Sequence, residues 1–306
     1  MMNNLKNKKI ITAALTGALT PAGYHIPATP EEISEDAYAC WKAGAAVVHL
    51  HMRDDQGFGT MDVEKFRETI KLIKRHKDFD GIINCTTSGD AAACNGSPEG
   101  DQLRMKHIRE LDGIEMASYD SGSFNWMPLQ VFMNTPKFLE ELGDVFISRN
   151  IKPEIEIFDT GQLSVAKYFV EHGHLSTPCH FQLCMGILGG MPASVQNLAF
   201  LVEKLPENST WSAFGIGTSH MPIMFATLAL GGNIRVGLED NVVYGKDENG
   251  KRIPATNVML VERAVRVIKE FGMQVATPKE AREILGIPQL SERNWNSRRP
   301  DRKSVE

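Results

Sequence analysis

Two histidines, His49 and His51, are the residues whose type and spacing suggest chemistry most directly. They end an apolar run at 46–51. If that run is a β-strand, both imidazoles lie on one face, while Val48 and Leu50 lie on the other. Two imidazoles so placed can bind one Zn²⁺ or another divalent transition metal ion. The alternative is a hydrogen-bonded histidine pair in the core, and we favour the metal because the two share a face.

A catalytic metal site needs a third protein ligand, and Glu239 is the candidate. It closes the apolar run that begins at 234, and Asp240 follows it directly. Adjacent strand residues point to opposite faces, so Asp240 would be free to act as a catalytic base. Arg235, four residues before Glu239, can pair with a carboxylate and tune its pKa. For Glu239, a structural acid paired with an arginine is the alternative.

Small polar side chains at the ends of two other runs could bind the oxygens of a substrate. Thr86, Thr87 and Ser88 stand at the end of one run, and Ser118 and Asp120 at the end of the next. Ordinary turn chemistry before a helix is the alternative reading of each hydroxyl residue.

Two acids and two glycines complete the candidate set. Glu154 and Glu156 share one face of an apolar run, where buried acids are costly unless they are used. Gly189 and Gly190 could let a cofactor approach the backbone closely, although the glycines alone favour the alternative, a tight strand-to-helix turn.

These residues stand at the ends of short apolar runs that alternate with longer amphipathic stretches. The expected strands are 10–15, 46–51, 81–86, 114–118, 154–158, 180–184, 211–216 and 234–238. The expected helices lie near 29–44, 62–76, 98–111, 135–147, 161–173, 193–204, 219–230, 256–272 and 277–285. The polar stretch 243–254 is expected to be a long exposed loop.

Eight β-then-α units predict an α/β fold, a (β/α)8 TIM barrel, in which chemistry sits at the carboxyl ends of the strands. A doubly wound open sheet is the alternative, but the first βα turn has no glycine-rich fingerprint. We expect one barrel domain over 1–306, with a peripheral tail at 287–306.

Composition excludes several classes of function. The formal net charge of -5 over 306 residues argues against nucleic-acid binding, and no apolar run is long enough to span a bilayer. Three lysines before the run at 10–19 mimic a signal peptide, but the run also suits a first buried strand, which we prefer. The chain has 5 cysteines and no C-x-x-C pair, which suits a reducing, cytoplasmic location.

Several segments together resemble the β-keto acid cleavage enzyme family. They are Thr-Ala-Ala-Leu-Thr-Gly-Ala at 12–18, His-Leu-His-Met-Arg-Asp at 49–54, Pro-Glu-Ile-Glu-Ile-Phe at 153–158, Gly-Gly-Met-Pro at 189–192 and Arg-Val-Gly-Leu-Glu-Asp-Asn at 235–241. The resemblance runs over residues 10–285, and five motifs in the same order are far more specific than any one of them.

The resemblance implies a zinc-dependent acyltransferase that is usually a homotetramer. It would convert a β-keto acid and acetyl-CoA into acetoacetate and a new acyl-CoA. By position, His49, His51 and Glu239 match the metal ligands, and Asp240 and Arg235 match the base and its partner. Thr86, Ser118 and Glu156 match residues that line the substrate pocket, and we group Glu156 with the catalytic residues.

One departure from the family concerns substrate choice. The member that cleaves 3-keto-5-aminohexanoate carries a glutamate after the Thr-Gly-Ala segment to meet the substrate's ammonium, and this chain has Leu19 there. An ammonium beside leucine would be poorly solvated, so we expect a neutral or apolar β-keto acid.

Two alternatives come from other classes. One is a different metal-dependent barrel enzyme of the aldolase or amidohydrolase type, although amidohydrolases carry their His-x-His pair near the first strand. The other is a non-catalytic barrel that binds a metal or metabolite.

Overall fold

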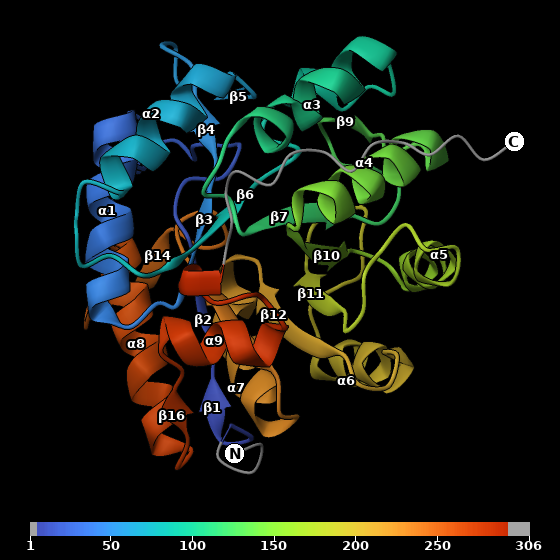
Figure 1. Cartoon of the computed structure of the whole chain (residues 1–306). Helices are drawn as coiled ribbons and strands as arrows, with labels where there is room; N and C mark the ends of the chain where they lie inside the picture. Colours follow the sequence, from blue (N-terminus) through green and yellow to red (C-terminus); the bar gives the residue numbers. More distant parts are fainter. Residues whose placement is uncertain (1–4, 293–306) are drawn as a thin grey trace, which may run out of the picture.

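The eight expected strands close into a parallel barrel (Figure 1). The computed structural model describes residues 5–292. In barrel order the strands are β2 (Ile11–Ala14), β3 (Val47–Leu50), β6 (Ile82–Cys85), β7 (Met116–Asp120), β10 (Lys152–Ile157), β11 (His180–Met185), β12 (Thr210–Gly215) and β13 (Asn233–Val236). Ile234 of β13 pairs with Ile11 of β2 and closes the ring. The predicted (β/α)8 barrel is therefore confirmed, and the open sheet is excluded.

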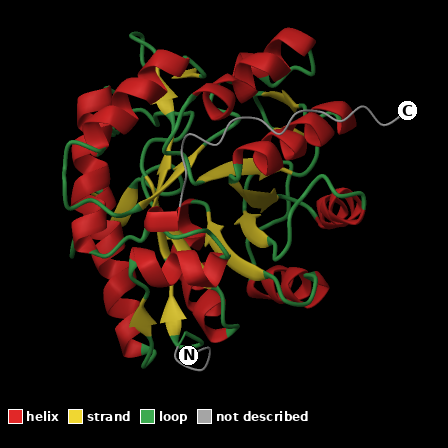
Figure 2. Cartoon of the chain, viewed as in Figure 1, coloured by secondary structure: helices red, strands yellow, loops and turns green. Residues whose placement is uncertain are grey.

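Helices surround the barrel on the outside (Figure 2). They are α1 (Pro30–Ala43), α2 (Val63–Ile73), α3 (Pro98–Glu110), α4 (Pro136–Arg149), α5 (Thr160–Glu171), α6 (Val195–Lys204), α7 (His220–Ala229) and α8 (Asn257–Glu270). The first begins as its sequence predicts, because the Thr29 side chain accepts from the amide of Glu32 and Pro30 occupies the first turn. Apolar faces of these helices bury the outer face of the barrel.

A further helix, α9 (Pro278–Leu285), seals the amino-terminal end of the barrel. Figure 1 shows it lying across β2. Ala281 and Leu285 of this helix pack against Ile10, Ile82 and Met116 at the strand starts. With this end closed, the other end is left for a site.

Short β-hairpins form separate two-stranded sheets outside the barrel. They are formed by β4 (Met52–Arg53) with β5 (Gly59–Thr60), β8 (Phe124–Trp126) with β9 (Gln130–Phe132), and β14 (Val243–Lys246) with β15 (Arg252–Pro254). The expectation of a long loop at 243–254 is wrong, because β14 and β15 pair antiparallel across the turn. Outside the barrel, β1 (Lys8–Lys9) pairs with β16 (Gln274–Val275).

The expected peripheral tail at 287–306 falls mostly outside the described residues, which end at 292. Ile287, at its start, is buried against α9. Within the described range, no helix combines the length and apolar character needed to cross a membrane.

Candidate metal centre and active site

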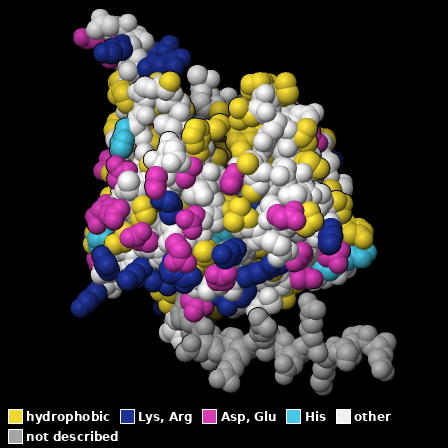
Figure 3. Space-filling model, turned by 90° about the horizontal axis from the view of Figure 1, so that it is seen from above, with side chains coloured by type: hydrophobic (Ala, Val, Ile, Leu, Met, Phe, Trp, Pro, Cys, Tyr) yellow, Lys and Arg dark blue, Asp and Glu magenta, His cyan; other side chains and the backbone are white. Residues whose placement is uncertain are grey.

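A cavity of about 870 Å³ opens at the carboxyl ends of the strands. In the space-filling view, hydrophobic side chains gather around a hollow in the surface, while charges of both signs are spread elsewhere (Figure 3). Most residues singled out from the sequence line this cavity. They are Leu19, His49, His51, Thr86, Ser88, Ser118, Asp120, Glu156, Arg235, Glu239 and Asp240.

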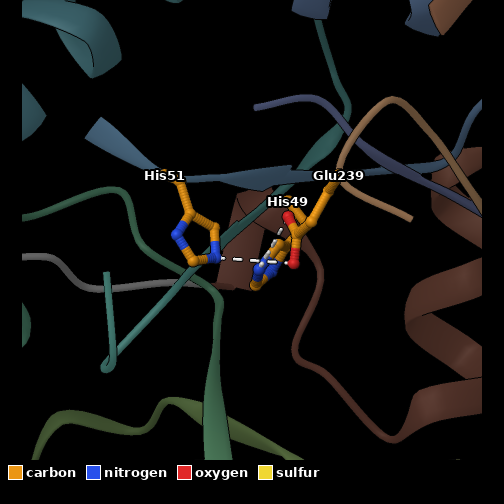
Figure 4. Close-up of side chains that lie close together, drawn as sticks. All are labelled: His49, His51 and Glu239. Atoms are coloured by element: carbon orange, nitrogen blue, oxygen red, sulfur yellow. Dashed lines mark ion pairs between the residues drawn. The ribbon is translucent and has the colours of Figure 1, made fainter. Parts of the chain in front are cut away.

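Three of these side chains converge on one point (Figure 4). The Nε2 atom of His49 lies 3.7 Å from Oε2 of Glu239, and Nε2 of His51 lies 3.5 Å from Oε1. One potential ligand atom from each residue lies within 4.8 Å of the others. The structure thus brings together the three residues predicted to hold a metal.

The protonation of this cluster fits a cation. Burial lowers the pKa of His49 to about 3 and also lowers the pKa of His51, so both imidazoles are neutral near pH 7. Burial opposes ionisation of Glu239, yet the neighbouring Arg235 guanidinium is the main cause that lowers its pKa to about 2. Neutral imidazole nitrogens and a carboxylate then face one another with lone pairs, and Glu239 Oε2 has no hydrogen-bond partner. Two imidazoles and one carboxylate are a catalytic zinc donor set, so the residues fit the metal that the sequence implies.

A buried carboxylate stands behind His49. Glu154 Oε2 lies 3.6 Å from Nδ1 of His49, and Asn84 Nδ2 donates to the same oxygen at 2.7 Å. A carboxylate at the far nitrogen of an imidazole favours the tautomer whose other nitrogen is free for a metal. Glu154 on β10, an acid whose burial is costly unless it is used, therefore lies next to His49.

Arg235 is the centre of the charged network. Its Nη1 donates to Glu156 at 3.1 Å and its Nη2 to Glu239 at 2.5 Å. Its Nε and Nη2 donate to the two oxygens of Asp240, each at 3.0 Å. The guanidinium lies over the ring of Phe214, 4.5 Å from its centroid. One cation thus holds three carboxyl groups in place beside the two histidines.

The expectation that Glu239 closes a regular strand, with Asp240 on the opposite face, is wrong. The strand β13 ends at Val236, and Gly237 has φ 152°. A Cβ on Gly237 would lie 1.9 Å from the carbonyl oxygen of Ala14, so only glycine allows this approach. The turn that follows directs both Glu239 and Asp240 toward Arg235. Burial raises the pKa of Asp240 to about 6, although Arg235 opposes the shift.

A second acidic pair lies opposite, on β7 and β10. Asp120 and Glu156 are register partners, and both line the cavity. Burial and the neighbouring Asp120 raise the pKa of Glu156 well above its usual value. Arg104 Nη2 lies 4.0 Å from Asp120 Oδ2 and supplies positive charge from behind.

The hydroxyl residues divide into two groups. Thr86, Ser88 and Ser118 line the cavity. Thr87 is fully buried and is not brought to the cavity, because its amide donates to Ser118 Oγ and its hydroxyl to the Ser118 carbonyl, each at 3.0 Å. Thr87 therefore positions Ser118 rather than facing a substrate.

Gly189 and Gly190, which the sequence suggests could let a cofactor approach the backbone, are not among the residues that line the cavity. A Cβ on Gly189 would lie 1.6 Å from the carbonyl oxygen of Asn125, and one on Gly190 would lie 2.8 Å from that of Phe158. A tight turn accounts for both glycines, since Gly189 lets the loop approach Asn125 of the β8–β9 hairpin and Gly190 lets it approach Phe158 after β10.

Two features of the site are not predicted from the sequence. The first is an apolar wall of the cavity formed by Phe124, Trp126, Phe132, Phe158, Ile187, Phe214 and Ile216. The aromatic residues at 124–132 were the available signal, but nothing local says that a hairpin folds over the barrel mouth. The second is Arg53, whose guanidinium donates to the carbonyls of Thr16 and Ala18 at 3.1 and 3.0 Å and so holds the loop that carries Leu19.

The chain belongs to the β-keto acid cleavage enzyme family. The family model, described as beta-keto acid cleavage enzyme, matches residues 8–287. The chain is 38% identical over 285 residues to a 3-keto-5-aminohexanoate cleavage enzyme of Fusobacterium nucleatum, covering 92% of this chain and 99% of that protein.

The chain is also similar to a second relative and to a solved structure. The chain is 36% identical over 301 residues to a 3-dehydrocarnitine:acetyl-CoA trimethylamine transferase of Rhizobium meliloti, covering 93% of this chain and 98% of the relative. The solved apo structure of ObcA superposes with a TM-score of 0.75 at 22% identity, over 86% of this chain and 65% of ObcA. That structural likeness supports the barrel fold.

Proposed function

We propose that this protein transfers an acyl group between a β-keto acid and acetyl-CoA, giving acetoacetate and a new acyl-CoA. The observation that carries the proposal is the convergence of His49, His51 and Glu239 beside the Arg235–Asp240 pair, inside the cavity of a family barrel. The name of the Rhizobium relative includes acetyl-CoA, which supports the same co-substrate here.

The metal proposed for His49, His51 and Glu239 is Zn²⁺. When bound, it would supply Lewis acidity that stabilises negative charge on carbonyl oxygens. Glu154, behind His49, would keep the imidazole in the ligating tautomer.

Asp240 is proposed as the base, held in place by both of its contacts to Arg235. Each of its oxygens keeps a lone pair for a proton, and the residue lines the cavity. It would take a proton from the carbon between the carboxylate and the keto group of the substrate. Thr86 and Ser118 would hold substrate oxygens.

The carbon chemistry then balances without a protein nucleophile. The substrate carbanion attacks the acetyl carbonyl, and the thioester bond breaks to release CoA thiolate. The thiolate adds to the original keto carbon. The bond between that carbon and the carbon that attacked the acetyl group then breaks. The products are the acyl-CoA and acetoacetate, whose carbon recovers the proton from Asp240.

The acyl group is proposed to be neutral or apolar. Leu19 lines the cavity where the aminohexanoate-cleaving member of the family carries an acid. The aromatic wall that includes Phe124, Phe158 and Phe214 offers no counter-charge to an ammonium group.

Assembly and location complete the proposal. We propose a single barrel domain that acts as a cytoplasmic homotetramer. The exposed apolar side chains of the β8–β9 hairpin, Met127, Leu129 and Val131, favour burial in an interface. Light scattering coupled to size-exclusion chromatography tests the tetramer directly.

The deciding experiment incubates the zinc-loaded protein with acetyl-CoA and a panel of β-keto acids, and follows the acyl-CoA products by mass spectrometry. Neutral, apolar substrates should be cleaved best, and omission of acetyl-CoA should abolish turnover. Cleavage without acetyl-CoA would point instead to an aldolase- or amidohydrolase-type reaction. Metal binding without turnover of any panel member would favour a non-catalytic barrel.

A further inference from the structure

Two like charges face each other across the β14–β15 hairpin at the edge of the cavity. Lys246 of β14 and Arg252 of β15 are register partners. Both side chains are exposed, and both line the cavity. Like charges directly opposite on an antiparallel pair repel each other and destabilise it. The hairpin therefore keeps an unfavourable pair at a place where a ligand can reach it.

The acids of the hairpin do not relieve this repulsion. Among residues 5–292, neither Lys246 nor Arg252 has a carboxylate partner within 4.0 Å. The nearby Asp247 carboxylate accepts instead from the amides of Asn249 and Lys251, each at 2.9 Å. That acid closes the turn and leaves both cations available to a ligand.

A third cation lies at the base of the hairpin. Arg263 of α8 lines the cavity, and its Nη2 donates to the Tyr244 carbonyl at 2.6 Å. Its guanidinium also lies 3.6 Å from the centroid of the Tyr244 ring. Arg266 donates to the Tyr244 hydroxyl at 2.9 Å. The strand that carries Lys246 is thus anchored to α8, so the positive charge is held on a fixed support.

The charge of the cavity is divided between its walls. The carboxyl groups lie deep around Arg235, the wall containing Phe124 and Phe214 is apolar, and the hairpin is basic. Among the described lining residues, the hairpin and the adjoining Arg263 supply the positive charge that a ligand with several negative charges can meet. Guanidinium groups suit phosphate because they donate two parallel hydrogen bonds.

We propose that Lys246, Arg252 and Arg263 bind the phosphate groups at the nucleotide end of CoA. The acyl thioester at the other end of CoA then extends along the same cavity to His49, His51 and Glu239. This assignment rests on the proposed function, because it places the co-substrate of that reaction.

The test measures equilibrium binding by calorimetry, independently of turnover. Lys246→Gln combined with Arg252→Gln removes both charges while keeping polar side chains of similar reach. Lys251→Gln is the matched control, because Lys251 lies in the same hairpin but does not line the cavity. The probes are CoA, dephospho-CoA and pantetheine, which carry successively fewer phosphates.

The double variant should weaken CoA binding about tenfold or more, with a smaller loss for dephospho-CoA and no change for pantetheine. Added salt should weaken CoA binding by the wild type more than by the variant. The control should bind all three probes as the wild type does.

Unchanged CoA affinity in the double variant, or an equal loss for pantetheine, would overturn the hairpin assignment. An equal loss of CoA affinity in Lys251→Gln would also overturn it, since the effect would then be general surface charge. If the wild type binds neither CoA nor pantetheine, the proposed function fails as well. If the wild type turns over acetyl-CoA but the variant binds CoA normally, only the hairpin assignment fails.

Discussion

The Nε2 atom of His51 lies 3.5 Å from Oε1 of Glu239, although His51 directly follows β3 and Glu239 lies in the turn after β13. The strand β2 lies between them in the barrel, so closure of the sheet is what brings them together. A metal bound here would join the first and last parts of the barrel.

Replacing His49 and His51 by alanine should remove the metal and the activity together, because a single remaining carboxylate ligand cannot hold a transition metal tightly. Metal content by plasma mass spectrometry should fall from about one ion per chain to near zero. His220→Ala is the control, since His220 lines the same cavity outside the cluster and its loss should leave the metal in place. Full metal occupancy in the double variant would refute the site.

Glu154→Gln should weaken the metal site without removing a ligand. The variant keeps the shape of the side chain near His49 but loses the charge that favours the ligating tautomer. Loss of such an outer carboxylate costs about 10- to 100-fold in metal affinity or activity. Competition with a chromogenic chelator measures the affinity, and a normal thermal transition checks the fold. Unaltered metal affinity would show that Glu154 has only a packing role.

Asp240→Asn should lower kcat by about 10²- to 10⁴-fold while the metal stays bound, because loss of a general base affects the proton transfer and not the ligand set. The amide keeps the size of the side chain beside Arg235. Steady-state kinetics and metal content are measured on the same preparation. A kcat close to that of the wild type would mean that another group removes the proton.

The barrel and the main residues of the site could be predicted because they depend on regular strands. Alternation along 46–51 places His49 and His51 on one face, and barrel closure then brings in Glu239. The same rule failed for Asp240, because Gly237 ends the strand early and a turn reverses the expected orientation. The alternation of side chains between two faces holds within a strand and does not predict how side chains point in a turn.

Other parts of the site depend on contacts between distant segments. Nothing in the sequence distinguishes Thr87 from Thr86, yet the Thr87 amide and hydroxyl both form hydrogen bonds with Ser118 on the neighbouring strand. The hairpin at 243–254 has no regular apolar alternation, so its pairing and its place at the cavity could not be inferred. Such features are set by tertiary packing rather than by local pattern.

Leu19→Glu should shift substrate preference toward β-keto acids that carry an ammonium group. The side chain is half exposed at the cavity, so the new ion pair should be modest, with kcat/KM for 3-keto-5-aminohexanoate rising up to about fivefold relative to a neutral analogue. Leu19→Gln is the matched control, because it adds polarity without charge. An equal effect of glutamine and glutamate would show that charge at this position does not select the substrate.

Arg282→Met should destabilise the fold from the end of the barrel opposite the cavity. Arg282 donates through Nε and Nη2 to the two oxygens of Glu115, each at 2.8 Å, and all of these groups are buried. Removing one partner of a buried ion pair is strongly destabilising, at a cost of about 3–5 kcal/mol in the free energy of unfolding. Arg67→Met is the control, since its 3.0 Å pair with Glu64 is exposed and should be worth less than about 1 kcal/mol. Guanidinium chloride titration of both variants gives the comparison, and equal losses would show that burial of the Arg282–Glu115 pair adds nothing.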